Sequence, residues 1–229
     1  MKNADSDPQK ALLDHLLEFL TPNRKSLFEK VIANRTRHIT VILEDIYQPH
    51  NASAVLRTCD LTGIQDVHII ENNNQYDVNP DVALGASKWL NLFKYNETEQ
   101  NTLLTFEKLR KQGYRIVAST PHKNDQDLES IPLDGKMAIV FGTELNGLSD
   151  IAFENADEFL KIPMFGFTES YNISVSAALI LFTLTNRLRN SSTNWSLSED
   201  EKQEILLEWS RRSIKRSDII ENQFLKNRK

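Results

Sequence analysis

Apolar and polar positions follow two different spacings along the chain. Between residues 38 and 190, short apolar runs such as TVILEDI, DVHII and KMAIVFG are separated by segments whose apolar residues recur at helical spacing. Strands that alternate with helices are typical of a mostly parallel sheet with helices on both faces. The pattern therefore predicts an α/β domain over residues 38–190, with further strands at NLFKY, RIVAST and EFLKIPM.

Helical spacing also predicts the segments between and around these strands. The segment PHNASAVLRTCDLTG should end at Gly63, a second helix should cover residues 97–112, and a last core helix should cover residues 172–190. Residues 8–36 contain two short helical patterns, which Pro22 interrupts, with Asn23 as a candidate N-cap.

The chain beyond Ser196 has the charge pattern of one more helix. SLSEDEKQEILLEWSRRSIKR starts with a serine N-cap and acidic residues and ends in arginines, which suits the helix dipole at both ends. We therefore expect an N-terminal helical extension over residues 1–37 and a basic, helical C-terminal extension over residues 191–229.

Composition narrows the class of protein. A chain of 229 residues with 40% hydrophobic residues can bury one substantial α/β core. No apolar stretch is long enough to cross a membrane and the first residues lack a secretion signal, so we expect a cytoplasmic protein without membrane contact. The single cysteine, Cys59, predicts neither a disulfide nor a metal site; a small buried hydrophobe or a reactive thiol are its two interpretations.

Charge is distributed unevenly along the chain. The formal net charge is −5, yet residues 51–186 hold 10 Lys and Arg against 18 Asp and Glu, whereas residues 187–229 hold 10 against 7. The clusters RRSIKR and KNRK in the basic end are of the kind that contact phosphates. A solvated helix face explains them equally well from charge alone.

Ligands of parallel sheets bind beyond the carboxyl ends of the strands, so the loops that follow the strands should hold the chemistry. Three such loops stand out: QPHNASAVLRT, FGTELNGLSD and IPMFGFTESYNISVSAA. None contains G-x-G-x-x-G, G-x-x-x-x-G-K-[ST] or G-x-S-x-G. This argues against a glycine-rich dinucleotide site, a nucleoside-triphosphate loop and a serine hydrolase.

The three loops carry a family resemblance. PHNASAVLRT, VFGTELNGLS and IPMFGFTESYNISVSAALILF resemble, in order and spacing, the three motifs of the SpoU class of SPOUT RNA methyltransferases. TVILEDIYQPHNASAVLRTCDLTGIQDVHII and GASKW are similar to the subgroup that methylates a guanosine 2′-hydroxyl in the tRNA D-loop, and the resemblance covers residues 28–210. It implies a C-terminal trefoil knot, a homodimer, S-adenosylmethionine as methyl donor and RNA, above all tRNA, as substrate.

The resemblance also implies roles for particular residues. The catalytic positions are Arg57, Asn51, Glu144, Ser170 and Asn172. The cofactor-binding positions are Ser119, Gly142, Glu144, Gly147, Ile162, Met164, Asn172 and Ile173. We expect RNA contacts from Arg35, His50, Arg187, Arg189, Arg211 and Arg212. Glu169 and Tyr171 depart from the family pattern beside the site serine, which affects how the pocket admits substrate.

Glycines and apolar residues carry two more expectations. Gly142 and Gly147 should let the backbone approach a ligand closely, and Gly166 should give its loop a turn. A two-glycine turn beside a solvated acid is the alternative for the first pair. The segment ISVSAALILFTL is more apolar than one sheet face requires, which predicts either a dimer contact or a helix buried within its own chain.

Arg57 can be interpreted from its position in the helix. Asn51 stands where an N-cap is expected, and Arg57 follows roughly 9 Å further along the axis. Helical side chains lean toward the N-terminus, so the guanidinium can return to the helix mouth, where an anion such as a phosphate beside the target ribose is favoured. A surface ion pair with Asp60 is the alternative.

The implied reaction requires a ribose 2′-hydroxyl to lose its proton while it attacks the methyl group. Arginine is a poor base, so we expect Arg57 to stabilise the developing alkoxide and to clamp a phosphate. The proton acceptor stays open, and His50 is either a relay or an RNA contact. A ribosomal RNA methyltransferase and a knotted RNA-binding protein without catalysis are the alternatives; joint retention of the motif residues argues against the second.

Overall fold

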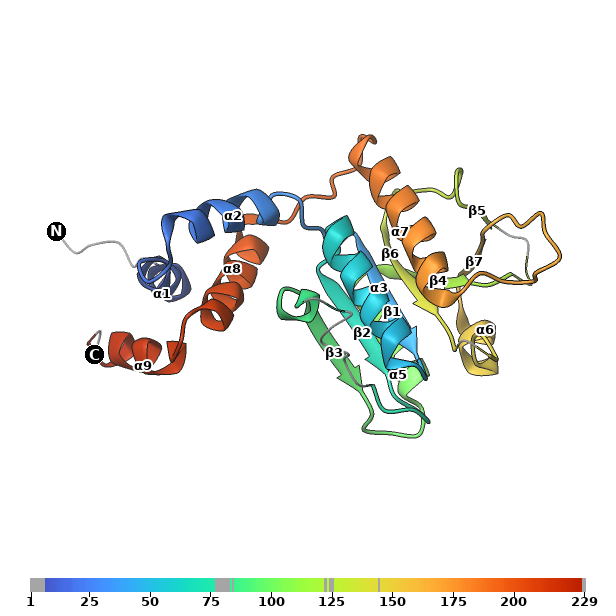
Figure 1. Cartoon of the computed structure of the whole chain (residues 1–229), viewed down its shortest axis with the longest axis horizontal. Coiled ribbons are helices and arrows are strands. Elements are labelled where there is room, and N and C mark those ends of the chain that lie inside the picture. The colour runs from blue at the N-terminus through green and yellow to red at the C-terminus, as the bar shows by residue number, and fades with distance from the viewer. Residues whose placement is uncertain are drawn as a thin grey trace. The chain divides into compact units, whose positions relative to one another are not determined.

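The computed structural model describes residues 7–76, 83, 85–121, 123, 126–143 and 145–227. The chain forms two compact units (Figure 1). One is Thr36–Trp195, and the other joins the described parts of Met1–Arg35 and Ser196–Lys229. The two terminal segments thus belong to one helical unit.

The larger unit is built on a parallel sheet. Among the described residues, seven strands pair in the order β3-β2-β1-β6-β4-β7-β5, and every pairing is parallel. The strands are β1 Ile39–Glu44, β2 Asp66–Ile70, β3 Asn91–Tyr95, β4 Tyr114–Ser119, β5 Gln126–Asp127, β6 Lys136–Phe141 and β7 Glu158–Lys161. The predicted α/β class is confirmed, and DVHII and NLFKY coincide with β2 and β3. The trefoil knot stays a prediction.

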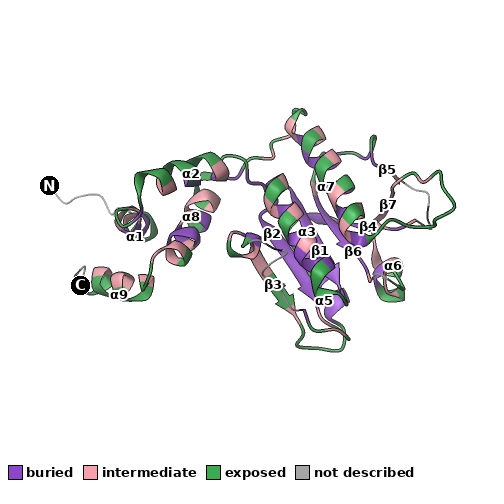
Figure 2. Cartoon of the chain, in the orientation of Figure 1, coloured by how far each residue is buried: buried purple, intermediate pink, exposed green. Residues whose placement is uncertain are grey.

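Helices bury both faces of this sheet. α3 Pro49–Thr62 and α7 Ile173–Arg189 lie side by side on one face (Figure 1), where they cover Val41 and Leu43 of β1. α5 Asn101–Lys111 covers Ile42 on the opposite face, and α6 Asp150–Asn155 packs beside α5. β1 and β2 are therefore buried along their whole length (Figure 2), which is why their sequences read as nearly continuous apolar runs.

The register aligns the carboxyl ends of the central strands. Leu43 of β1 pairs with Phe141 of β6, Ala118 of β4 pairs with Val140 of β6, and Ser119 of β4 pairs with Leu160 of β7. The loops that follow these strands consequently leave the sheet at one edge. Three short elements of the described chain were not predicted from the sequence pattern: η1 Ala86–Lys88, β5 and α6.

Helix ends differ from the prediction in one way that matters for the site. α3 begins at Pro49 behind the N-cap Gln48, because proline is well suited to the first helical position. Asn51 is therefore the third residue of the helix, and its prediction as the N-cap is wrong. The predicted end is confirmed, since Gly63 adopts the left-handed conformation with φ 83°.

The helical unit consists of α1 Pro8–Leu17, α2 Pro22–Ile32, α8 Glu199–Ser213 and α9 Ser217–Asn227. Leucines from α1 and α8 form its core, and Thr21, not Asn23, caps α2 by accepting from Arg24 N–H. The helix predicted after Ser196 is confirmed as α8, which Ser198 caps. It ends at Ser213, and α9, which was not predicted, follows the turn at Ile214 to Arg216. Among the described residues, no helix is both long and apolar enough to cross a membrane.

Candidate active site

A cavity of about 320 Å³ opens at the carboxyl edge of the sheet. Its walls come from the ends of β4 and β6 and from the loops that follow β4, β6 and β7. Both the volume and the position are typical of small-molecule sites in parallel sheets.

The cavity collects residues that are far apart in the sequence. Every described cofactor-binding position of the sequence prediction lines it: Ser119, Gly142, Gly147, Ile162, Met164, Asn172 and Ile173. Ser170 lines it as well, whereas Glu144 lies outside the described residues. Apolar side chains and short polar groups thus line the same cavity, which suits a ligand with both an apolar ring and polar substituents.

The loop after β6 closes on itself. Thr143 N–H donates to the Gly147 carbonyl at 2.7 Å, and Gly147 N–H donates back to the Thr143 carbonyl at 3.1 Å. A Cβ atom at Gly142 would overlap the Gly147 carbonyl group, and Gly147 itself has φ 69°. The loop needs both glycines for its own closure. Their close approach to a ligand stays a prediction, and both line the cavity. Gly166 has neither a positive φ nor a described neighbour that a Cβ would meet.

The first and third motifs meet through two asparagines. Asn172 caps α7 by accepting from Ser174 N–H at 2.8 Å, and its amide group donates to Asn51 Oδ1 at 3.3 Å. Asn51 is buried and donates in turn to Gln48 Oε1 at 3.2 Å. Ser174 Oγ donates to Asn172 Oδ1 at 2.6 Å, so this serine orients the asparagine.

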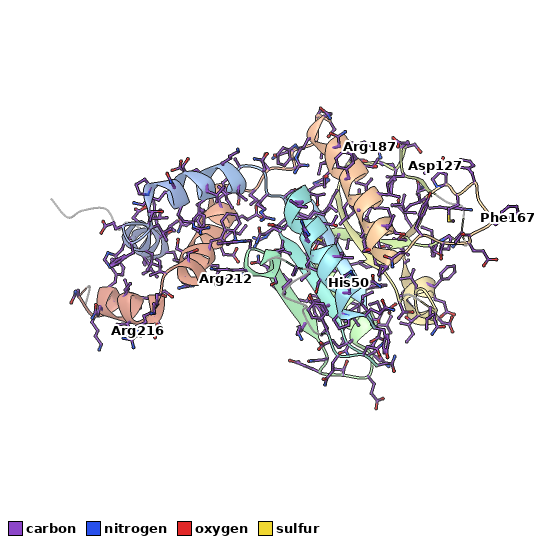
Figure 3. The ribbon with its side chains drawn as sticks, viewed as in Figure 1. His50, Asp127, Phe167, Arg187, Arg212 and Arg216 are labelled. Carbon is purple, nitrogen blue, oxygen red and sulfur yellow. The ribbon has the colours of Figure 1, made fainter. Side chains whose placement is uncertain are left out.

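Arg57 stands apart from the cavity of its own chain. It is exposed on α3, it is not a cavity-lining residue, and it has no ion pair with Asp60 or any other described residue. His50, at the start of α3 (Figure 3), Arg57 and Leu61 follow one another at helical spacing and are all exposed. These three residues define what we call the open face of α3.

Four of the six predicted RNA contacts have structural roles. Arg187 donates to the carbonyls of Leu128 and Ile131, and Arg189 donates to the Thr62 carbonyl at 2.7 Å. Arg211 forms ion pairs with Glu208 and Glu221. Arg35 is buried, and its guanidinium lies over the Trp209 ring. Their guanidinium groups serve the fold, so the geometry does not support them as RNA contacts, whereas His50 and Arg212 are exposed.

Two acidic residues at the site were missed by the sequence analysis. Glu44 ends β1, Asp45 follows it directly, and both are buried. Asp45 has φ 53°, and its carboxylate accepts from the backbone N–H groups of Asn72 and Asn73. Two acids directly after the apolar run TVIL, at the edge where ligands bind, are a signal that could have identified them.

Metal binding has no support in the side chains around the site. Within the described part of the chain, no group of three or more His, Cys, Asp or Glu residues could hold a metal ion.

The fold and the cavity define an α/β protein with a small-molecule site at the carboxyl edge of a parallel sheet. A model of the SpoU rRNA Methylase family matches residues 38–182, and the chain belongs to this family. It is 45% identical to the tRNA (guanosine(18)-2′-O)-methyltransferase of Borreliella burgdorferi over 90% of this chain and 93% of that protein. The enzyme of the same name from Thermus thermophilus is 31% identical over 84% of this chain and 98% of its own length.

Solved structures agree with this membership. The crystal structure of the Aquifex aeolicus TrmH/SpoU tRNA modifying enzyme superposes with a TM-score of 0.72 at 27% identity and covers 85% of this chain and 98% of that chain. The SpoU methyltransferase AviRb from Streptomyces viridochromogenes, solved with the cofactor AdoMet, is 19% identical with a TM-score of 0.57, covers 72% of this chain and 62% of that chain, and shares the fold.

Proposed function

We propose that this protein transfers a methyl group from S-adenosylmethionine to the 2′-hydroxyl of a guanosine in the D-loop of tRNA. The observation that carries the proposal is the convergence of the second and third motifs on one cavity, with the first motif joined to the third by the Asn51–Asn172 hydrogen bond. The names of the relatives at 45% and 31% identity support the same substrate. We expect the protein to act in the cytoplasm, because its proposed substrate is tRNA.

The cavity residues fit this methyl donor. Ile162, Met164 and Ile173 provide apolar surface for a purine ring, and the backbone of the loop after β6 lies against the same space. Ser170 and Asn172 supply polar groups beside it. S-adenosylmethionine, when bound, supplies the electrophilic methyl group, and no metal takes part.

Substrate activation falls to the first motif. The Arg57 guanidinium stabilises the negative charge that develops on the ribose 2′-oxygen and binds an adjacent phosphate, since its donors are not engaged by other described residues. Asn51 holds Asn172 at the cavity wall through their hydrogen bond. His50, exposed on the same open face, contacts the RNA.

The position of Arg57 supports a homodimer with shared sites. Val175, Leu179 and Phe182 form an exposed apolar stripe along α7, and Phe182 is 67% exposed. Leu61, on the neighbouring α3, is 76% exposed. A second copy that covers α3 and α7 would bury this surface and would bring Arg57 of one copy to the cavity of the other.

A mixing experiment tests the shared site. Arg57→Ala and Asn172→Ala are each expected to be inactive. If Arg57 acts across the interface, a mixed dimer of the two variants would contain one intact site out of two and should regain up to about half of the activity of a wild-type dimer. Absence of recovery in verified mixed dimers would place Arg57 and the cavity of one chain in the same site. Sedimentation at low micromolar concentration should show about twice the monomer mass.

The function itself is tested by binding and by product mapping. Calorimetry in the presence of a chelator should detect S-adenosylmethionine, and methylation assays with tRNA transcripts should modify one D-loop guanosine. A transcript with 2′-deoxyguanosine at that position is the matched control and should stay unmodified. Absence of binding for both the donor and its demethylated product would refute the enzyme. Ribosomal RNA, tested in parallel, should not be modified.

A further inference from the structure

Glu44 connects three parts of the fold at the carboxyl edge of the sheet. It is the last residue of β1 and is 1% exposed. Its Oε1 accepts from Thr102 Oγ1 and from Ser149 Oγ, each at 2.7 Å, and its Oε2 accepts from Ser149 N–H at 3.0 Å. Thr102 lies in the first turn of α5, whereas Ser149 ends the loop after β6 and caps α6.

The direction of these hydrogen bonds requires an acceptor at both oxygens of Glu44. Ser149 Oγ already accepts from Ala152 N–H at 3.1 Å, and Thr102 Oγ1 already accepts from the Asn72 amide group at 3.0 Å. Each hydroxyl therefore directs its single hydrogen at Glu44. A carboxylate can accept at both oxygens. The amide of a glutamine has the same shape, but its NH₂ group would face either the two hydroxyl groups or Ser149 N–H, all of which act as donors here.

The same contacts fix both ends of the loop after β6. The loop begins at Gly142, directly after Phe141, which pairs with Leu43 of β1. It ends at Ser149, which is bonded to Glu44, the next residue of β1. The described residues between these ends line the cavity, and one of them, Leu145, is 93% exposed. The loop thus depends on its two ends and on its own closure for its position.

We infer that Glu44 is a positioning residue that holds this loop in the geometry that binds S-adenosylmethionine, through Ser149. The inference rests on the proposed function, because it names the same ligand. Thr102 provides an internal comparison, since it also donates to Glu44 Oε1 but lies in α5 and does not line the cavity.

The test compares four variants by donor calorimetry and thermal unfolding. Glu44→Gln and Ser149→Ala should each weaken S-adenosylmethionine binding by about tenfold or more, as expected for a lost hydrogen bond to a charged group. Thr102→Val should lower the unfolding temperature yet change donor affinity by less than about twofold. Ser149→Thr, which keeps the hydroxyl and the cap, should restore binding. The double variant Glu44→Gln/Ser149→Ala should lose less donor-binding free energy than the sum of the two single losses, because both substitutions break the same hydrogen-bond network.

Amide hydrogen exchange of residues 142–148 provides a readout without ligand. Exchange should accelerate in Glu44→Gln and Ser149→Ala and stay at the wild-type rate in Thr102→Val. The inference is overturned if the first two variants keep wild-type exchange in this loop, or if Thr102→Val weakens binding as much as Ser149→Ala at equal loss of stability. A wild-type protein that does not bind the donor would instead refute the proposed function, and the exchange data would still decide the role of Glu44.

Discussion

The open face of α3 and the basic positions of α7 and α8 present the same side chain in two opposite settings. On α3, Arg57 is exposed and has no ion pair with a described residue. On α7 and α8, Arg187 and Arg211 are bound to carbonyl or carboxylate groups of the fold. An arginine without internal partners can give all its donors to a substrate phosphate, whereas one with internal partners must first break those bonds.

The bound arginines also show why a count of basic residues misleads. Arg187 joins α7 to the carbonyls at 128 and 131, which lie between β5 and β6. Hydrogen bonds from Arg211 to Glu221, and then to Glu208, raise the pKa of its guanidinium further above its usual value. Most of the expected basic RNA surface therefore stabilises the fold. The exposed cations Arg212, at the end of α8, and Lys215 and Arg216, in the turn that follows it, are better candidates for RNA contacts.

The largest effect is expected at Arg57. Arg57→Ala should lower the turnover rate by about two to three orders of magnitude, as loss of an oxyanion-stabilising donor does. Donor affinity and unfolding temperature should stay nearly unchanged, because Arg57 has no hydrogen bond or ion pair with another described residue. Single-turnover methylation at saturating tRNA measures the effect. Lys111→Ala, which removes another exposed cation, is the control. Normal turnover of Arg57→Ala would show that Arg57 takes no part in catalysis.

Arg187 should show the reverse behaviour. Arg187→Ala removes two hydrogen bonds to carbonyl groups, one of them on the fully buried Ile131, and should lower the free energy of unfolding by about 2 kcal/mol. Turnover measured well below the unfolding temperature should change by less than about twofold. Urea unfolding measures the free energy of unfolding. Unchanged stability together with weakened tRNA binding would show instead that Arg187 contacts RNA.

The buried histidine His68 extends the comparison to the pH dependence of stability. Burial lowers the pKa of His68 to about 3, below its ordinary value of 6.5. The unfolded chain therefore binds the proton more readily, so the stability due to neutral His68 is present above pH 6.5 and is lost as the pH falls toward 3. Between pH 7.5 and 5.5 the loss should be about 1 kcal/mol.

His68→Gln should reduce this pH dependence. Part of the dependence should remain in His68→Gln, because burial also lowers the pKa of His38. Urea unfolding at the two pH values measures the difference. If the free energy of unfolding changes equally between the two pH values in wild type and in His68→Gln, His68 is not responsible for the pH dependence.

The smallest effect concerns the turn between α8 and α9. If Lys215 contacts a phosphate, Lys215→Ala should weaken tRNA binding a few fold and lower the slope of log affinity against log salt by up to about one unit. Turnover at saturating tRNA should not change. Arg211→Ala should leave the salt slope unchanged, because Glu208 and Glu221 already pair with this residue. Equal salt slopes in wild type and Lys215→Ala would identify this turn as a solvated surface.

Much of the fold could be predicted because its determinants are local. β2 and β3 were predicted to the residue, since strands of a parallel sheet carry short apolar or β-branched runs bounded by polar residues. The end of α3 at Gly63 followed from the left-handed conformation that glycine adopts easily. The start of α3 was misplaced, because Pro49 and Asn51 both suit a helix start and only the backbone of Gln48 decides between them.

The sequence by itself determined the strand and helix pattern, the three loops and the family resemblance, because each depends on neighbouring residues. The tertiary structure decided which side chains meet. Asn51 and Asn172 are 121 positions apart, and Glu44 and Ser149 are 105 apart, yet both pairs are joined by hydrogen bonds. Whether an arginine binds its own fold or remains open to substrate depends on such distant partners, and their proximity arises only when the chain packs.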